Sequence, residues 1–191
     1  MAKTIAISSA KGGVGKSTCT VEIANAIRNI THKRVLVIDM DENSSLGENI
    51  GADLATDKTI YQVLKAQCSI NDAIQHHRLF DVIVGSKSLS KAPIEFIERD
   101  DVYLLADIIS LINDEYDYIF IDNAPSRSVL LTMTEIAADY VVIPTMADSA
   151  SIKLVYEMEE DVYKLVNSRN KESHAEIIGY KIGRASCRER V

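Results

Sequence analysis

Apolar residues along this chain gather in short runs that each end at a polar residue or a glycine. Four clear runs, rich in aliphatic and aromatic residues, predict strands at Thr4–Ala10, Arg34–Asp39, Tyr116–Asp122 and Ala138–Pro144. A weaker run covers Leu79–Gly85, and Ala175–Lys181 resembles a sixth strand. Because the runs are nearly continuous rather than alternating, they are typical of strands buried on both faces in a parallel sheet.

Between the strands, apolar residues recur at the three- and four-residue spacing of amphipathic helices. This spacing predicts helices at Ser17–Asn29, Thr59–Ala66, Val102–Ile112, Val129–Ala138 and Ser149–Val166. Strands that alternate with helices predict a doubly wound α/β domain, with a mostly parallel sheet and helices on both faces. Ligands of such sheets bind outside the carboxyl ends of the strands, so functional motifs are expected there.

The composition is that of an ordinary globular domain, with 191 residues, 47% of them hydrophobic and 26% charged. The formal net charge of −7 argues against a uniformly basic nucleic-acid binder, but not against a local basic patch formed by dimerisation. The sequence has neither a signal-peptide pattern nor a run of about 18 apolar residues. Its three cysteines form no CxxC pair or disulfide framework, which favours a cytoplasmic protein.

The end of the chain departs from the repeating pattern of strands and helices. Residues 182–191, IGRASCRERV, are basic and lack a hydrophobic repeat, and they resemble the translation of a sequencing-library adapter. We therefore expect one domain over residues 1–181, truncated at its C-terminal end, followed by a non-native tail. A genuine basic tail is the alternative.

The strongest motif is AKGGVGKST at Ala10–Thr18, which joins the first predicted strand directly to a helix. Its glycines allow the backbone to curl tightly, and the N–H groups of the turn and of the helix N-terminus form an anion site. Lys16 is placed to reach the β- and γ-phosphates of a nucleotide, and the Ser17 hydroxyl to bind Mg²⁺. The strand–loop–helix layout predicts a phosphate-binding loop rather than a structural turn.

The loop departs from the plain Walker pattern, because Ala10 replaces its first glycine and Lys11 adds a second lysine. KGGVGKST resembles the deviant loop of the ParA/MinD group of ATPases, which includes partitioning proteins, division-site regulators and the nitrogenase iron protein. The resemblance implies that Lys11 reaches across an ATP-sandwiched homodimer to the partner's nucleotide. It also implies ATP contacts along the whole motif, from Lys11, Gly12, Gly13, Val14, Gly15, Lys16, Ser17 and Thr18.

Carboxylates end two further predicted strands, at Asp39 and Asp122, and Asp41 lies close behind the first. A carboxylate at the end of a buried strand beside a phosphate site fits a bound cation, because its desolvation is otherwise uncompensated. By resemblance, Asp39 lies near the Mg²⁺ shell and Asp41 positions the attacking water. Asp122 matches the Walker-B carboxylate that holds an Mg²⁺ ligand. The surrounding letters DMDEN and DNAPS differ from the D-x-D-P-Q and D-T-P-P that are usual in the family.

The resemblance extends over Ala2–Lys181 and is strongest to short partitioning ATPases of the ParA type. It implies a slow ATPase with ATP and Mg²⁺ as cofactors, which dimerises with ATP and binds DNA non-specifically as a dimer. A ParB-like partner would stimulate hydrolysis. In that mechanism, Lys11 and Lys16 offset the phosphate charge while Asp41 orients water.

Three other functions remain open. A MinD-like membrane-associated ATPase would require an amphipathic C-terminal helix. A P-loop ligase or kinase that acts on a small molecule would not require Lys11. A nucleotide-binding scaffold without turnover would not require Asp41. The scattered histidines and cysteines indicate no metal cluster, which disfavours the iron-protein branch.

Overall fold

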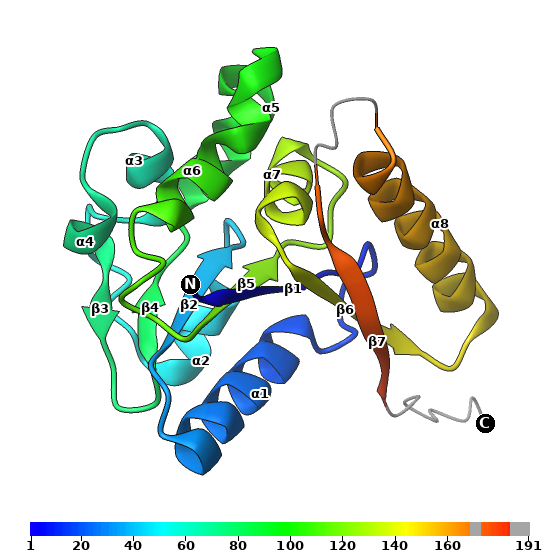
Figure 1. Ribbon diagram of the computed structural model, residues 1–191, viewed down its shortest axis with the longest axis horizontal. Coiled ribbons are helices and arrows are strands. Elements are labelled where there is room, and N and C mark those ends of the chain that lie inside the picture. Colours follow the sequence, from blue (N-terminus) through cyan, green and yellow to red (C-terminus); the bar gives the residue numbers. More distant parts are fainter. Residues whose placement is uncertain (169–172, 184–191) are drawn as a thin grey trace, which may run out of the picture.

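The computed structural model describes residues 1–168 and 173–183, which form a seven-stranded sheet between two layers of helices (Figure 1). The strand order is β3-β4-β2-β5-β1-β6-β7, and only the β3–β4 pair is antiparallel. The doubly wound, mostly parallel fold expected from the sequence is therefore confirmed. The strands are β1 (Lys3–Ile7), β2 (Val35–Met40), β3 (Gln75–His76), β4 (Asp81–Ile83), β5 (Tyr118–Asn123), β6 (Tyr140–Met146) and β7 (Glu176–Gly183).

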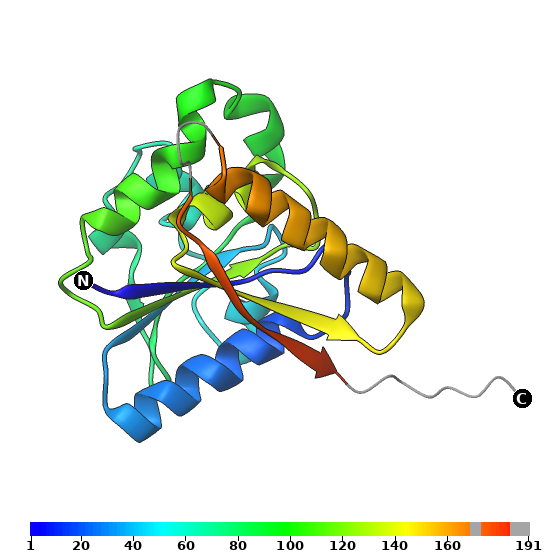
Figure 2. The ribbon, with the colours of Figure 1, turned by 45° about the vertical axis from the view of Figure 1, so that its right-hand side comes forward.

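The connecting helices vary from single turns to the long α1 and α8 (Figure 2). The α-helices are α1 (Lys16–Thr31), α2 (Ser45–Ile50), α3 (Ile60–Leu64), α4 (Ile70–Ala73), α5 (Ala92–Glu95), α6 (Leu104–Ser110), α7 (Val129–Ala137) and α8 (Ser149–Val166). Two 3₁₀ helices, η1 (Lys87–Lys91) and η2 (Arg99–Tyr103), precede α5 and α6. Among the described residues, no helix is both long enough and apolar enough to cross a bilayer.

Each predicted strand and helix is present, with boundaries that shift by a few residues. The helix predicted at Val102–Ile112 is shorter, because its first turn belongs to the 3₁₀ helix η2. Strand β7 continues to Gly183, so residues 182 and 183 of the expected tail pair with Thr145 and Met146 of β6. The rest of that tail, 184–191, lies outside the described residues.

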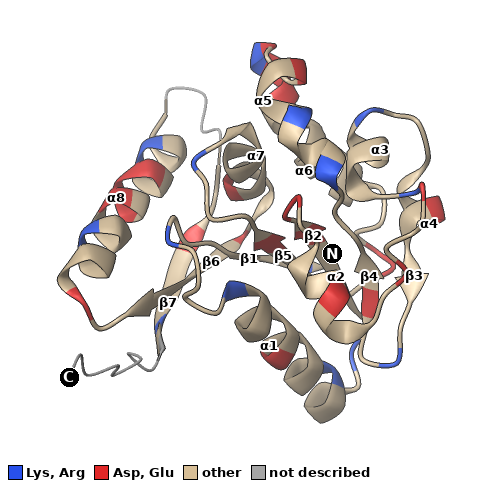
Figure 3. Cartoon of the chain, turned by 180° about the vertical axis from the view of Figure 1, so that it is seen from behind, with Lys and Arg blue, Asp and Glu red and all other residues tan. Residues whose placement is uncertain are grey.

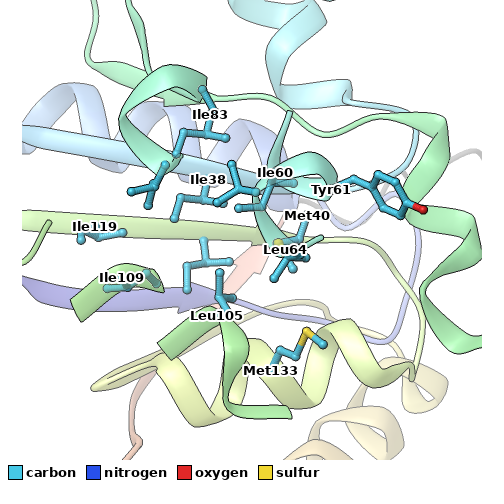
Figure 4. Packing of buried hydrophobic residues seen from close by; sticks show 14 of the residues in the cluster. Ile38, Met40, Ile60, Tyr61, Leu64, Ile83, Leu105, Ile109, Ile119 and Met133 are labelled. Atoms are coloured by element: carbon cyan, nitrogen blue, oxygen red, sulfur yellow. The ribbon is translucent and has the colours of Figure 1, made fainter. Parts of the chain in front are cut away.

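The central strands have apolar residues on both faces, up to the carboxylates near their ends, because alternate residues enter different cores. On β2, Leu36, Ile38 and Met40 pack against the layer of α3, α6 and α7 (Figure 4). The intervening Val35 and Val37 join the core under α1 and α2. Burying one such side chain contributes roughly 1.5–3 kcal/mol, so both faces of the strand stabilise its place in the sheet.

A third core joins α8 to the β6 side of the sheet, where Met158 and Val162 pack with Val141 and Ile143. Because β1, β2, β5 and β6 are parallel, their carboxyl ends share one edge of the sheet. In register, Asp122 of β5 lies between Asp39 of β2 and Ile7 of β1. The predicted phosphate loop and both predicted carboxylate motifs therefore meet at this edge.

Candidate functional site

The loop between β1 and α1 has the backbone shape of an anion cradle. Gly13 and Gly15 adopt φ values of 73° and 86°, a region in which residues with a Cβ are strained. Gly15 is the N-cap of α1, and the first helical turn leaves N–H groups without intrahelical partners. A cavity of about 230 Å³ opens here, lined by Gly13, Gly15, Lys16, Ser17, Thr18, Asp41, Ser45, Asn49 and Pro125.

Lys16 lies inside this loop, with only 7% of its surface exposed. Its Nζ donates a hydrogen bond of 3.3 Å to the carbonyl oxygen of Lys11. Burial lowers the pKa of Lys16, while the charges of Asp122 and Asp41 act in the opposite direction. A partly desolvated ammonium group in a ring of N–H donors suits a ligand with several negative charges, such as a polyphosphate.

Asp122 is fully buried at the end of β5, and burial raises its pKa to about 6. One carboxylate oxygen accepts a hydrogen bond of 2.9 Å from the Thr20 hydroxyl, and the Ser17 hydroxyl also helps to lower the pKa. The other oxygen, Oδ2, has no hydrogen-bond partner among the described residues. A buried carboxylate oxygen without a partner, next to the Ser17 hydroxyl, fits a cation that would bind there.

Mg²⁺ fits this donor set. It usually binds through one or two protein oxygens, substrate phosphates and water rather than through an all-protein cage. Residues 1–168 and 173–183 contain no group of three or more His, Cys, Asp or Glu side chains that could hold a metal. Among the described residues, the Ser17 hydroxyl and the Asp122 carboxylate could supply the protein oxygens for such an ion, which stays a prediction.

Asp39 lies beside Asp122 and is also fully buried, and burial together with the charge of Asp122 raises its pKa to about 7. Its Oδ1 accepts from the Asp41 N–H at 3.0 Å. Its Oδ2 accepts from the Ser44 hydroxyl at 3.2 Å and from the Gly47 N–H at 3.3 Å. Asp39 therefore fixes the loop after β2, and its place in the Mg²⁺ shell stays a prediction.

Asp41 lines the cavity, with 9% of its surface exposed. Its Oδ1 accepts from the backbone N–H of Asn43 at 3.0 Å and from the Asn43 side-chain amide at 3.1 Å. These bonds form a local turn that the side chain itself stabilises. Asn43, which replaces the glutamine of the family pattern, thus orients the carboxylate that was predicted to position water.

Lys11 points away from the cavity towards the N-terminus of α8. Its Nζ donates hydrogen bonds of 2.8 Å to Asp148 Oδ2 and to Ser151 Oγ. The bond from Lys11 and those from Ser151 lower the pKa of Asp148 to about 2. The sequence assigned no functional role to the segment around Asp148. The contact of Lys11 with this segment is therefore seen only in the structure.

No role was predicted for two further polar residues, Thr20 and Asn123. Thr20, one turn after Lys16, bonds to Asp122 as described above. Asn123 is buried, donates to the Ser8 hydroxyl at 2.9 Å and accepts from the Thr134 hydroxyl at 2.9 Å. This amide links β1, β5 and α7 where the family usually has threonine or cysteine.

Comparison with known proteins identifies relatives over most of the chain. The sequence profile of an AAA domain family matches residues 2–175. The chromosome-partitioning ATPase Soj of Treponema pallidum is 33% identical over 152 residues, which cover 78% of this chain and 58% of that protein. The curated relatives are longer, and this chain spans between about half and two thirds of their length.

Solved structures show the same architecture. A putative plasmid partition protein from Borrelia burgdorferi B31, bound to AMPPNP, is 29% identical with a TM-score of 0.81. The alignment covers 93% of this chain and 73% of that one. Cobyrinic acid a,c-diamide synthase from Mycobacterium smegmatis, with bound ADP and magnesium, has a TM-score of 0.86 at 22% identity. This alignment covers 95% of this chain and 74% of the synthase chain. At this identity, the similarity shows a shared fold only.

Proposed function

Because this chain belongs to the ParA/Soj family of AAA-domain ATPases, we propose that it is a Mg·ATP-dependent switch for plasmid or chromosome partitioning. In this proposal it hydrolyses ATP to ADP and phosphate, forms an ATP-dependent homodimer in the cytoplasm and binds DNA non-specifically as that dimer. A ParB-like partner controls the hydrolysis. The observation that supports it most is that Lys16, Ser17 and Asp41 line one cavity at the loop between β1 and α1.

The residues act by position and charge. The N–H groups of residues 11–18 and the Lys16 ammonium hold the β- and γ-phosphates. Ser17 and Asp122 would hold Mg²⁺, whose charge would offset negative charge on the phosphates. The Asp41 carboxylate, fixed by Asn43, orients the attacking water. A positioned carboxylate of this kind contributes about 10²-fold or more to a rate.

Replacing Asp41 tests the assignment of the hydrolytic step. We expect Asp41→Ala to retain Mg·ATP binding and to lose about 10²-fold or more in phosphate release, because water is no longer oriented. Glu42→Ala is the matched control, since its exposed side chain neighbours Asp41 in the chain. Wild-type turnover in Asp41→Ala, or an equal loss in Glu42→Ala, would assign the role to another residue.

Replacing Lys11 tests the dimer. If Lys11 serves the partner's nucleotide, it must first leave Asp148 and Ser151, to which it is bonded within its own chain. Lys11→Ala should then bind ATP through Lys16 but stay monomeric with ATP in sedimentation velocity. Asp148→Asn, which weakens the competing contact, should dimerise at least as well as the wild type. Loss of ATP binding in Lys11→Ala without an effect on assembly would contradict the dimer assignment.

A P-loop ligase or kinase is the second candidate. A cavity of about 490 Å³ adjoins the phosphate cavity and shares Asp41 and Pro125 with it, which leaves room for a small acceptor molecule. The two candidates differ in what they need for turnover. The partitioning ATPase releases phosphate from ATP without a small acceptor, whereas a ligase or kinase releases little until its acceptor is added. Phosphate release from Mg·ATP by the purified chain, measured with no acceptor molecule added, therefore distinguishes the two candidates.

A further inference from the structure

A third cavity lies between α7 and α8. Its volume is about 500 Å³, and it is lined by Arg127, Ser128, Val129, Leu131, Thr132, Glu135, Asp161, Lys164 and Leu165. It shares no lining residue with the phosphate cavity. None of the predicted nucleotide, magnesium or catalytic residues belongs to it. The cavity is therefore not explained by the proposed function.

Glu135, on α7, is the residue of this cavity that most needs a ligand. Only 3% of its surface is exposed, and its Oε1 has no hydrogen-bond partner in the described part of the chain. Burial raises the pKa of Glu135 to about 7, the charge of Asp161 adds to the rise, and Arg127 opposes it. A buried carboxylate oxygen without a partner costs free energy unless a donor reaches it.

The nearby cations are already engaged by other carboxylates. An Arg127 nitrogen lies 2.9 Å from Asp161 and 3.3 Å from Glu157. Lys164 lies 2.9 Å from Glu160. Figure 3 shows that α8 carries acidic residues between two lysines. Among the described residues, Arg127 and Lys164 therefore form their ion pairs with carboxylates other than Glu135.

We propose that this cavity binds an organic cation of side-chain size, a guanidinium or alkylammonium group, whose charge pairs with Glu135. The aliphatic stem of such a group would lie against the apolar part of the lining, as the stems of buried Lys and Arg side chains do. The apolar part consists of Val129, Leu131 and Leu165. The cation is either a free amine or guanidine, or the basic side chain of a partner protein.

Other ligand classes fit the cavity less well. A metal ion would need several oxygen or nitrogen ligands, and the described residues contain no cluster of three or more suitable side chains. An anion would approach the uncompensated carboxylate of Glu135 and be repelled. A purely apolar ligand would leave Glu135 without a partner, at the full cost of its desolvation.

Binding is testable on the 191-residue chain without nucleotide, so a failure of the ATPase proposal would not decide the outcome. Nα-acetyl-arginine amide is titrated at about pH 8, where Glu135 is mostly ionised, and amide chemical shifts are followed by NMR. Nα-acetyl-citrulline amide is the matched probe, because it is nearly isosteric and uncharged. We expect shifts confined to α7 and α8, and about tenfold weaker binding of the citrulline probe, as for loss of a charged hydrogen bond.

Two variants complete the test. Glu135→Gln removes the charge at constant shape and should weaken the arginine probe about tenfold. Leu165→Trp fills the cavity and should abolish binding without touching a charge. Equal affinity for the two probes, or unchanged binding in either variant, would overturn the proposal. Agmatine, a free guanidine without flanking amides, shows whether the natural cation is a small molecule or a protein side chain. A site for a small molecule should bind agmatine at least as tightly as the arginine probe. A site for a protein side chain should prefer the arginine probe, which has flanking amides.

The affinity should also depend on pH. The groups that face Glu135 are Arg127 from the loop before α7, and Asp161 and Lys164 from α8. Burial raises the pKa of Glu135 itself to about 7. Binding of the arginine probe should therefore weaken about tenfold between about pH 8 and pH 6 in the wild type, and stay nearly constant in Glu135→Gln. A wild-type affinity that does not change over this range would contradict the assignment.

Discussion

Asp39, Asp122 and Glu135 are carboxylates that the fold removes from water, and burial is the main cause of the raised pKa of each. Both carboxylate oxygens of Asp39 accept hydrogen bonds from the segment that follows β2. Asp122 and Glu135 each keep one oxygen without a partner among the described residues. At the residue scale, these two oxygens mark the two places where a cation would stabilise the chain: Mg²⁺ at Asp122 and an organic cation at Glu135.

The raised pKa of Glu135 predicts a dependence of stability on pH. Since the folded pKa of about 7 exceeds the unfolded value, the folded state binds the proton more tightly. This contribution to stability is complete below about pH 4.5 and is lost as pH rises through 7. Glu135→Gln carries no such charge, so the free energy of unfolding of the wild type should fall by roughly 2–3 kcal/mol relative to the variant between pH 4.5 and 8.

Urea unfolding of both proteins across this pH range measures the difference. Asp39 and Asp122 titrate in the same window, but they are present in both proteins and their contributions cancel in the comparison. A difference between wild type and variant that stays constant with pH would show that Glu135 is not buried as described.

At the element scale, the site depends on how the ends of β2, β4 and β5 pack. The register of β2 and β5 places Asp39 opposite Asp122. Gly85, just after β4, lies so close to the loop after β2 that an added Cβ would contact the backbone oxygens of Asp41 and Asp39, the latter at 2.9 Å. The position of the Asp41 carboxylate therefore depends on the absence of a side chain at residue 85.

Gly85→Ala should consequently disturb Asp41 more than the phosphate loop. We expect phosphate release to fall by about tenfold or more, as for a misplaced catalytic group, with a smaller change in ATP affinity. Overpacking at this contact should also cost about 1–3 kcal/mol of stability. Gly179→Ala is the matched control, because an added Cβ at Gly179 of β7 meets no atom within 4 Å. Equal activity of the two variants would show that the loop tolerates the methyl group.

The elements that the sequence predicted are those with a continuous apolar run or an amphipathic repeat. The central strands have continuous apolar runs because both faces are buried, and α8 has its full amphipathic stripe, so each could be located from the sequence. The elements α2, α4 and β3 were not predicted, because their six, four and two residues show neither a continuous apolar run nor a clear amphipathic repeat. The phosphate loop and its carboxylates were predicted by motif. The roles of Asp148, Gly85 and Glu135 depend on contacts between distant segments, which no local pattern reveals.

At the scale of the whole molecule, the sheet order brings four distant segments to one edge. The phosphate loop, the loop after β2, the end of β5 and the start of α8 lie far apart in the sequence. They meet because β2, β5, β1 and β6 are parallel neighbours. In such a fold the ligand contacts the loops that follow several strands. Its binding should therefore stabilise the whole domain rather than one element.

The central claim is that this edge binds Mg·ATP through Lys16, and calorimetric titration of Mg·ATP tests it most directly. Removing a partly desolvated charge that pairs with phosphate costs about 2–5 kcal/mol, so Lys16→Ala should bind at least about 30-fold more weakly than the wild type. Lys153→Ala, an exposed lysine of α8, should bind like the wild type. Equal affinity of Lys16→Ala and the wild type would contradict the account.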